Sequence, residues 1–241
     1  MKSRTSLPAI RSLLLVGAAS LLISACGNGS SGNQAASSSP SSSPQPTSSS
    51  AASPSASPAG QAKSWSKPPE MQIDVNKSYT AEVQTNKGSF KIELFAKQAP
   101  KTVNNFVFLS KQGFFENITF HRIIDTFMVQ TGDPTGTGMG GPGYKFEDEL
   151  NTGFSYEPGI VAMANSGKNT NGSQFFICTG EDSKSLNQRP NYSIFGKVVE
   201  GMDTVTKIAQ TPVKINPQSN DRSPSMPTEK VVIQKVTIVE K

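Results

Sequence analysis

The sequence is poor in the residues that metal centres and disulfide scaffolds require. Its 241 residues include only two cysteines and one histidine. Two cysteines form neither a disulfide framework nor a four-cysteine zinc site, and a single histidine excludes a multi-histidine metal centre. A stapled mini-protein and a zinc finger are therefore excluded, and any function has to come from other residue types.

The N-terminus has the pattern of a targeting segment. Lys2, Arg4 and Arg11 precede an uncharged, mainly apolar run over residues 12–23, and small residues follow before Cys26. A positive segment followed by about a dozen apolar residues is typical of a signal peptide, and it is too short for an ordinary transmembrane span.

The residues around Cys26 indicate how this signal is processed. Ile23-Ser24-Ala25-Cys26 resembles the lipobox of bacterial lipoproteins, in which the cysteine is acylated and becomes the new N-terminus. The alternative is an ordinary secretory signal that leaves a cysteine near its cleavage site. Two or more acyl chains on one cysteine hold a protein stably on a membrane. We therefore predict a lipoprotein signal peptide over residues 1–25 and a bacterial, extracytoplasmic protein that Cys26 anchors to the cell membrane or cell envelope.

Residues 26–69 are predicted to be a linker. Between Gly27 and Ala62 no residue is charged, and Ser, Ala and Pro dominate. Such a segment buries too little apolar surface to offset the entropy of ordering, so we expect it to be disordered. Trp65 lies near its end and is either a packing residue at the domain edge or an exposed linker residue.

The formal net charge of +5 does not come from the folded part of the chain. The predicted signal peptide and linker contain five basic residues and no acidic one, which leaves 18 Lys and Arg against 18 Asp and Glu in residues 70–241. That segment contains no run of basic residues. We therefore expect no nucleic-acid-binding surface.

Residues 70–241 are enough for one domain with a sizeable core. Helices are predicted from Pro100 to just before Gly113 and after Gly201, since proline favours the first turn of a helix and glycine follows the last. Alternating or β-branched residues predict strands over 79–84, 89–95, 118–124, 128–130, 160–164, 174–178, 194–199 and 230–239. Many short strands with only two helices predict an all-β fold, a closed or sandwiched antiparallel sheet.

Two residue pairs could serve a hydrolase. They are Cys178 with His121 and Ser173 with His121, but neither nucleophile lies in a nucleophile-elbow sequence. Cys178 belongs to an apolar strand, where a cysteine is usually an inert core residue, and we interpret His121 as structural. A lipid-anchored hydrolase using Cys178 and His121 is retained as an alternative.

Two other segments suggest ligands at first sight. The glycine-rich run over residues 132–143 lacks the Gly-Lys-Ser/Thr ending of a phosphate-binding loop, and two prolines interrupt it. We expect instead a tightly folded loop that needs positive φ angles and close backbone approach. The acidic residues Glu147, Asp148 and Glu149 have no further ligands at a suitable spacing, so we interpret them as a solvated turn and not as a metal site.

Four motifs around one arginine resemble the cyclophilins, a family of peptidyl-prolyl cis–trans isomerases. They are FHRII at 120–124, FMVQTGD at 127–133, MAN at 163–165 and NTNGSQFFI at 169–177, and the resemblance covers residues 77–239. It implies an all-β fold, an eight-stranded antiparallel closed β-barrel capped by two helices, with a substrate groove on its outer face. It also implies a monomeric isomerase that binds proline-containing polypeptides and uses no cofactor and no metal.

The resemblance assigns roles by position. The catalytic arginine falls on Arg122, and Tyr192 takes the place of a histidine at the edge of the proline pocket. Ser185 aligns with a position where many members carry an aromatic residue, so weak binding of cyclosporin-type macrocycles is expected. The positions of the proline pocket fall on Phe127, Met128, Phe176 and Leu186. The positions that hold the substrate backbone fall on Gln130, Ala164, Asn165 and Gln174.

These residue types suit rotation about an X–Pro bond, which crosses a barrier of about 18–20 kcal/mol without making or breaking a bond to a heavy atom. A fixed guanidinium favours the twisted state, whose prolyl nitrogen accepts a hydrogen bond. The apolar residues would grip the ring and exclude water, although core packing is their alternative role. We therefore predict an isomerase that assists the folding of exported or envelope proteins; the alternative is a peptide-binding module or holdase without turnover.

Overall fold

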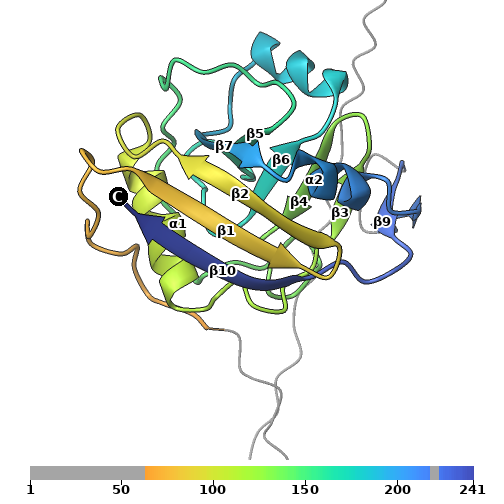
Figure 1. Cartoon of the computed structure of the whole chain (residues 1–241), viewed down its shortest axis with the longest axis horizontal. Coiled ribbons are helices and arrows are strands. Elements are labelled where there is room, and N and C mark those ends of the chain that lie inside the picture. The colour runs from red at the N-terminus through yellow and green to blue at the C-terminus, as the bar shows by residue number, and fades with distance from the viewer. Residues whose placement is uncertain (1–62, 218–222) are drawn as a thin grey trace, which may run out of the picture. The chain divides into compact units, whose positions relative to one another are not determined.

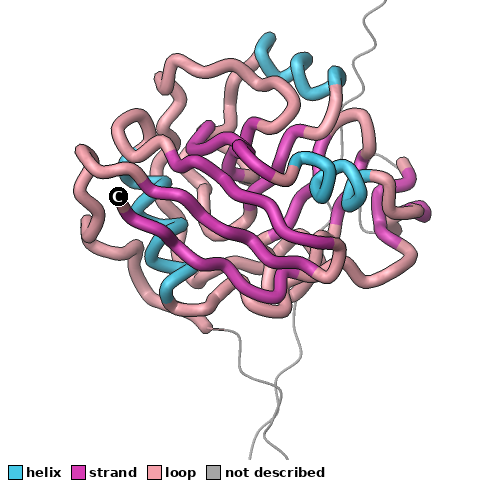
Figure 2. The backbone as a smooth tube through the Cα atoms, viewed as in Figure 1, coloured by secondary structure: helices cyan, strands magenta, loops and turns pink. Residues whose placement is uncertain are grey.

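The computed structural model describes residues 63–217 and 223–241 (Figure 1). These residues form ten strands, two α-helices and one 3-10 helix (Figure 2). The predicted signal peptide, Cys26 and the predicted linker up to residue 62 lie outside the described residues. Within the described ranges, no helix is long and apolar enough to cross a membrane.

Eight strands form one antiparallel sheet in the order β10-β1-β2-β7-β5-β6-β4-β3. Each of the eight overlaps a strand expected from the sequence, so the predicted eight-stranded antiparallel sheet is confirmed. The bounds are Tyr79–Thr85 (β1), Gly88–Leu94 (β2), Arg122–Ile124 (β3), Met128–Thr131 (β4), Ile160–Met163 (β5), Phe175–Cys178 (β6), Ile194–Glu200 (β7) and Ile233–Glu240 (β10).

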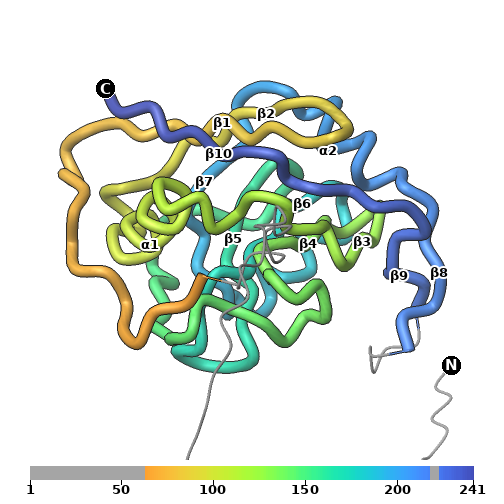
Figure 3. Tube along the Cα trace, turned by 90° about the horizontal axis from the view of Figure 1, so that it is seen from below, coloured from red at the N-terminus to blue at the C-terminus, as the bar shows by residue number. Residues whose placement is uncertain are grey.

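The sheet curls, and its two edges are joined by a segment just before β3. The backbone N–H of Phe120 donates to Val231 O at 2.9 Å, and that of Asn117 donates to Ile233 O at 2.8 Å. Thr119 forms an isolated bridge with Val232. The first half of the strand predicted over 118–124 therefore closes the sheet, and only its second half becomes β3. In Figure 3, β1, β2 and β10 lie as one layer above β3 and β4.

Helix α1 (Pro100–Lys111) packs against the curled sheet and contributes side chains to the main hydrophobic core. Its Phe106 is almost fully buried, and its ring centroid lies 5.2 to 5.4 Å from those of Phe115, Phe175 and Phe195. Pro100 presets the first turn, and Gly113 follows the helix with a φ of 62°. The helix predicted from these two residues is confirmed.

The acidic turn is not merely solvated, because its side chains hold neighbouring segments. Glu149 caps α1: its Oε2 accepts hydrogen bonds from the backbone N–H and the hydroxyl of Thr102, both at 2.8 Å. Asp148 accepts from the backbone of Asn169 at 2.7 Å, and Glu147 pairs with Lys101 at 3.0 Å. Among the described residues no group of histidine, cysteine and acidic residues could hold a metal ion.

Helix α2 (Met202–Ala209) also begins where the sequence predicts. Gly201 precedes it with a φ of 80°, and a Cβ there would lie 2.5 Å from Ser89 O, so the position requires glycine. The sequence did not predict three elements: the ribbon of β8 (Val213–Ile215) and β9 (Pro224–Pro227), and the 3-10 helix η1 (Glu181–Gln188).

An N-terminal strap, which we define as residues 64–74, passes beside α1 (Figure 3). The Trp65 ring packs against Phe108 and Phe114, with centroid distances of 5.2 and 5.9 Å. The backbone N–H of Trp65 also donates to Pro142 O at 2.8 Å. Of the two alternatives for Trp65, packing at the domain edge is therefore the one observed. Ile73 is buried in the core at the other end of the strap.

Replacing Trp65 with Ala is expected to lower the free energy of unfolding by about 1–3 kcal/mol, because it removes a partly buried aromatic side chain and two ring contacts. Urea unfolding of both proteins measures the difference. Met139→Ala is the control, since this side chain is 90% exposed. A Trp65→Ala variant as stable as the wild type would contradict docking of the strap.

Candidate functional site

The candidate site is built on alternation along neighbouring strands. Successive side chains of a strand point to opposite faces of the sheet, and paired residues share a face. Ile123, Val129, Ile177 and Val161 are paired in turn across β3, β4, β6 and β5, and all four lie in the main hydrophobic core. The residues between them must therefore lie on the outer face.

The outer face carries a row of predicted site residues. Arg122 on β3 pairs with Gln130 on β4, which pairs with Phe176 on β6, which pairs with Ala162 on β5. Two residues further along the same face, Met128 pairs with Cys178. The register thus brings together residues that lie up to 54 positions apart in the sequence, from Arg122 to Phe176.

The predicted proline pocket lies on a second hydrophobic cluster, separate from the main core. Met128 and Phe176 are buried in it, and the partly buried Phe127, Leu186 and Tyr192 pack against it. The rings of Phe176 and Tyr192 meet edge to face, 5.5 Å apart. Leu186 comes from η1, which follows β6 along the chain, and its side chain reaches the cluster. Ser185 beside it is exposed, and its hydroxyl donates to Asp182 O at 2.6 Å.

Arg122 lies at the edge of this cluster. The side chain is partly buried, and its Nη1 lies 3.7 Å from Met128 Sδ, within hydrogen-bonding range for sulfur. The guanidinium is therefore held beside the apolar surface that Met128 contributes. A charged donor beside an apolar surface is the arrangement that the predicted chemistry requires.

The glycine-rich loop beside the site is organised by Asp133, which sequence reasoning did not single out. Its buried carboxylate accepts hydrogen bonds from the backbone N–H groups of Thr135, Thr137, Gly138 and Gly140, at 2.6 to 3.1 Å. Burial alone would raise the pKa of Asp133, but the hydrogen bonds from Thr135, Gly140 and Gly138 outweigh it and lower the pKa. The carboxylate thus stays charged and fixes the loop.

The glycines of this loop are required for the reasons that the sequence suggested. Gly132 has a φ of 89°, and a Cβ there would lie 2.2 Å from Ser173 O. A Cβ on Gly140 would lie 2.1 Å from the Asp133 carboxylate. The predicted loop with positive φ angles and close backbone approach is confirmed.

The remaining predicted residues line a cavity of about 680 Å³, which we call the groove cavity. Its walls are the glycine-rich loop on one side and the segment after β5 on the other. Gln174 Nε2 donates to Gly138 O at 3.0 Å and Gly140 O at 2.8 Å, while Gln130 donates to Gln174 Oε1 at 2.9 Å. The predicted backbone-binding residues all line it: Gln130, Ala164, Asn165 and Gln174.

Tyr156 supports the far side of the site, and no motif or spacing in the sequence points to it. Its hydroxyl donates to Tyr192 O at 2.6 Å and accepts from the Tyr192 N–H at 3.1 Å. Burial raises the pKa of Tyr156 to about 12, so the hydroxyl keeps its proton. Asn165 Nδ2 also donates to Asn191 O at 2.9 Å, so two side chains fix the loop that carries Tyr192.

The hydrolase alternative finds no support in the geometry. Burial raises the pKa of the Cys178 thiol to about 12, so the thiolate that a cysteine nucleophile needs is disfavoured. The Ser173 hydroxyl donates to Gly132 O at 2.6 Å and makes no hydrogen bond to His121. Burial lowers the pKa of His121, which stays neutral inside the fold.

Comparison with known sequences agrees with this geometry. The family described as cyclophilin-type peptidyl-prolyl cis-trans isomerase/CLD matches residues 80–238. The chain is 44% identical over 176 residues to peptidyl-prolyl cis-trans isomerase A of Mycobacterium tuberculosis, covering 66% of this chain and 91% of that protein. It is 47% identical over 160 residues to peptidyl-prolyl cis-trans isomerase-like 1 of Aspergillus fumigatus, covering 65% and 92%.

Solved structures agree as well. A crystal structure of a cyclophilin-type isomerase from Cryptosporidium parvum is similar, with a TM-score of 0.59 and 37% identity, covering 68% of this chain and 99% of that one. The same protein crystallised in the presence of the dipeptide Ala-Pro gives a TM-score of 0.58 at 37% identity, covering 67% and 99%. The chain belongs to the cyclophilin-type peptidyl-prolyl cis–trans isomerases, and it is a peptidyl-prolyl isomerase.

The lowered pKa of Asp133 generates a pH-dependent prediction. A group whose folded pKa is depressed stabilises the fold above its unfolded pKa of about 3.9, and this contribution is lost as the pH falls through the folded pKa. Asp133→Asn is expected to cost about 1–3 kcal/mol of unfolding free energy at pH 7. The difference from wild type should shrink below about pH 4, where the wild-type carboxylate takes up a proton.

Urea unfolding from pH 7 to pH 2 measures this difference. Asp125→Asn is the matched control, because Asp125 is exposed. An Asp133→Asn variant as stable as wild type at pH 7 would overturn the role of the Asp133 carboxylate in fixing the loop. A difference in unfolding free energy that does not change with pH would do the same.

Proposed function

We propose that this isomerase acts on X–Pro bonds of exported or envelope proteins, tethered outside the cytoplasmic membrane through Cys26, with Arg122 as the catalytic residue. The observation that carries the catalytic assignment is the row of Arg122, Gln130 and Phe176 across three paired strands. It sets a permanent positive charge, an amide and an aromatic ring side by side on one outer face.

The proposed reaction needs no nucleophile. During rotation the prolyl nitrogen loses its amide resonance and becomes a hydrogen-bond acceptor, so a donor beside it stabilises the twisted state more than either planar state. The guanidinium of Arg122 lies next to Met128, which belongs to the proposed proline pocket. The apolar cluster around Met128 and Phe176 holds the ring and keeps water from the amide.

The groove cavity would hold the chain on one side of the proline. The Asn165 side chain already bonds to Asn191 O and accepts from the Gly167 N–H, so a substrate strand would meet the backbone here and not the amide. Gln174 is likewise bound to the glycine-rich loop. We therefore assign Gln174, whose amide is bound on both sides, to positioning of the wall. Gln130 donates only through its Nε2, to Gln174, and we assign its amide oxygen to contact with substrate.

The proposed location rests on the N-terminal sequence. A positive segment, an apolar run and the lipobox-like Ile23-Ser24-Ala25-Cys26 together favour acylation at Cys26. The uncharged Ser, Ala and Pro tract that follows would then separate the isomerase from the membrane. Clients would be the polypeptides that fold on that side of the membrane.

Arg122→Ala is expected to lower kcat/KM by about 10²–10³-fold, the usual cost of removing one transition-state donor. Exchange of the two isomers of an Ala-Pro peptide, followed by NMR, measures the rate. Arg122→Lys should be intermediate at best, because it keeps the charge and loses the planar fork.

Arg189→Ala is the matched control, since this exposed arginine lies outside the groove cavity. Unchanged exchange in Arg122→Ala would overturn the catalytic assignment. A wild-type protein that binds the peptide without accelerating exchange would favour the holdase.

Cys26→Ser is expected to abolish incorporation of labelled palmitate and to move the protein from the membrane fraction to the soluble one after expression in a bacterium. Loss of the thiol removes the acylation site, and one or no acyl chain holds a protein only marginally. Cys178→Ala is the matched control, because it removes the only other cysteine. A Cys26→Ser protein that still carries label would contradict the anchor.

A further inference from the structure

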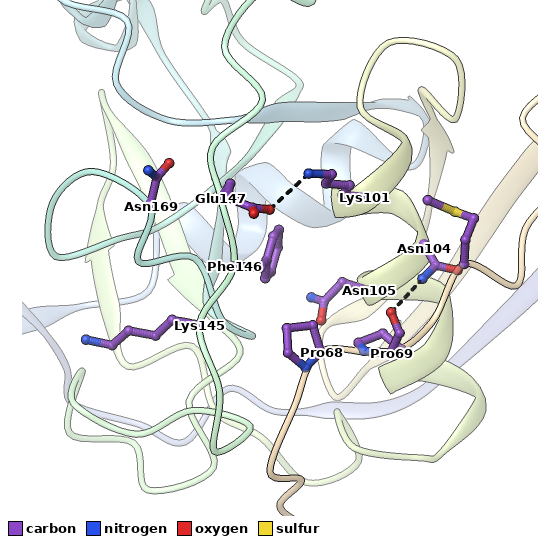
Figure 4. Close-up of a pocket in the computed structure, with 10 residues that line it drawn as sticks. Pro68, Pro69, Lys101, Asn104, Asn105, Lys145, Phe146, Glu147 and Asn169 are labelled. Carbon is purple, nitrogen blue, oxygen red and sulfur yellow. Dashed lines mark hydrogen bonds and ion pairs between the residues drawn. The ribbon is translucent and has the colours of Figure 1, made fainter.

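A second cavity lies between the strap and α1, on the other side of the wall that bounds the groove cavity. We call it the strap cavity; its volume is about 380 Å³. Pro68, Pro69 and Met71 of the strap form one wall. Figure 4 shows Phe146 and Glu147 on the side opposite Asn105 and Pro68. The cavity therefore exists because the strap is docked.

The walls of the strap cavity are held by hydrogen bonds from two neighbouring asparagines of α1. Asn104 Oδ1 accepts from the Gln72 N–H at 2.8 Å, and its Nδ2 donates to Glu70 O at 2.9 Å, which fixes the strap. Asn105 Nδ2 donates to Gly172 O at 2.9 Å, and its Oδ1 accepts from the Tyr144 hydroxyl at 2.6 Å. The strap cavity is thus preformed.

The same asparagine connects the strap cavity to the groove cavity. Tyr144 and Gly172, the two partners of Asn105, both line the groove cavity, and Lys145 lines both cavities. Asn169 lines the strap cavity, and the next residue, Thr170, lines the groove cavity. Residues 144–145 and 169–172 thus border both cavities, which are neighbours along the same segments. A polypeptide that extends from the groove cavity past these segments would reach the strap cavity.

The lining of the strap cavity indicates what it would accept. Its apolar surface is provided by the rings of Pro68, Pro69 and Phe146 and by Met71, whose side chain is 53% exposed. Polar residues complete the lining: Lys101, Asn104, Asn105, Lys145, Glu147 and Asn169. The charges at its edge are balanced, because Lys101 and Glu147 pair at 3.0 Å. The Lys145 side chain points away from it (Figure 4). Such a lining favours an uncharged, apolar side chain.

We propose that the strap cavity is a distal subsite that binds an apolar side chain of the substrate polypeptide, beyond the residues next to the isomerised proline. The shared border with the groove cavity and the balanced charge both favour this occupant. The inference rests on the isomerase activity at Arg122. Pro68, Pro69 and Met71 precede the family match at residues 80–238, so one wall of the subsite lies outside the matched domain.

The test compares two peptides on the full chain. The first is a short Ala-Pro tetrapeptide, and the second carries the same unit with about eight leucine-containing residues on either side, or about 28 Å of extended chain. Met71→Asp places a charge in the apolar cavity. The ratio of kcat/KM for the long peptide to that for the short one is expected to fall about tenfold, mainly through KM.

Ile215→Asp is the matched control, because Ile215 is also an exposed apolar residue, at 61%, and lines neither cavity. Its ratio should equal that of the wild type. A Met71→Asp ratio equal to wild type would overturn the distal subsite and leave the isomerase activity intact.

A second measurement does not depend on turnover. With ¹³C-labelled methionine methyl groups, the long peptide should shift the NMR signals of both Met71 and Met128, and the tetrapeptide that of Met128 alone. A long peptide that shifts Met128 and leaves Met71 unmoved would contradict the subsite. If wild type accelerates neither peptide, the catalytic assignment fails, and the Met71 signal still decides whether the cavity binds.

Discussion

The structure depends on the register of four short strands. Because side chains alternate along β3, β4, β6 and β5, one set of paired positions builds the core and the other builds the site. Ile123 and Ile177 on the inner face fix the positions of Arg122 and Phe176 on the outer one. A shift by one residue would bury the arginine and expose the core, so the packing that stabilises the fold also enforces the geometry of the site.

Around this rigid row, the walls of the site are loops held by buried polar groups. The Asp133 carboxylate accepts hydrogen bonds from backbone N–H groups of the glycine-rich loop. The Gln174 amide donates to two carbonyl oxygens of the same loop. Tyr156 holds the loop with Tyr192. Loops alone place groups loosely, whereas satisfied buried hydrogen bonds restrict them. The wall therefore keeps its shape before substrate binds, which lowers the ordering cost of binding.

The chemistry explains the residues that the site does not use. Rotation about an amide needs no nucleophile or general base, so Cys178 and His121 can serve packing. Burial raises the pKa of Cys178 and lowers that of His121, which favours the uncharged form of each.

The strap adds a different element. The backbone N–H of Trp65 binds the Pro142 carbonyl, so the strap borders the groove cavity.

Strand alternation, Pro100 and the glycines after the helices determined most of the fold from the sequence, because these signals are local. The motifs around Arg122 also named residues that the strand register brings together on one outer face. The docking of Trp65 on Phe108, the closing of the sheet by residues 117–120 and the support from Tyr156 were decided by the tertiary structure. Each of these is a contact between distant segments without a local period, so only the packed chain reveals which partners meet.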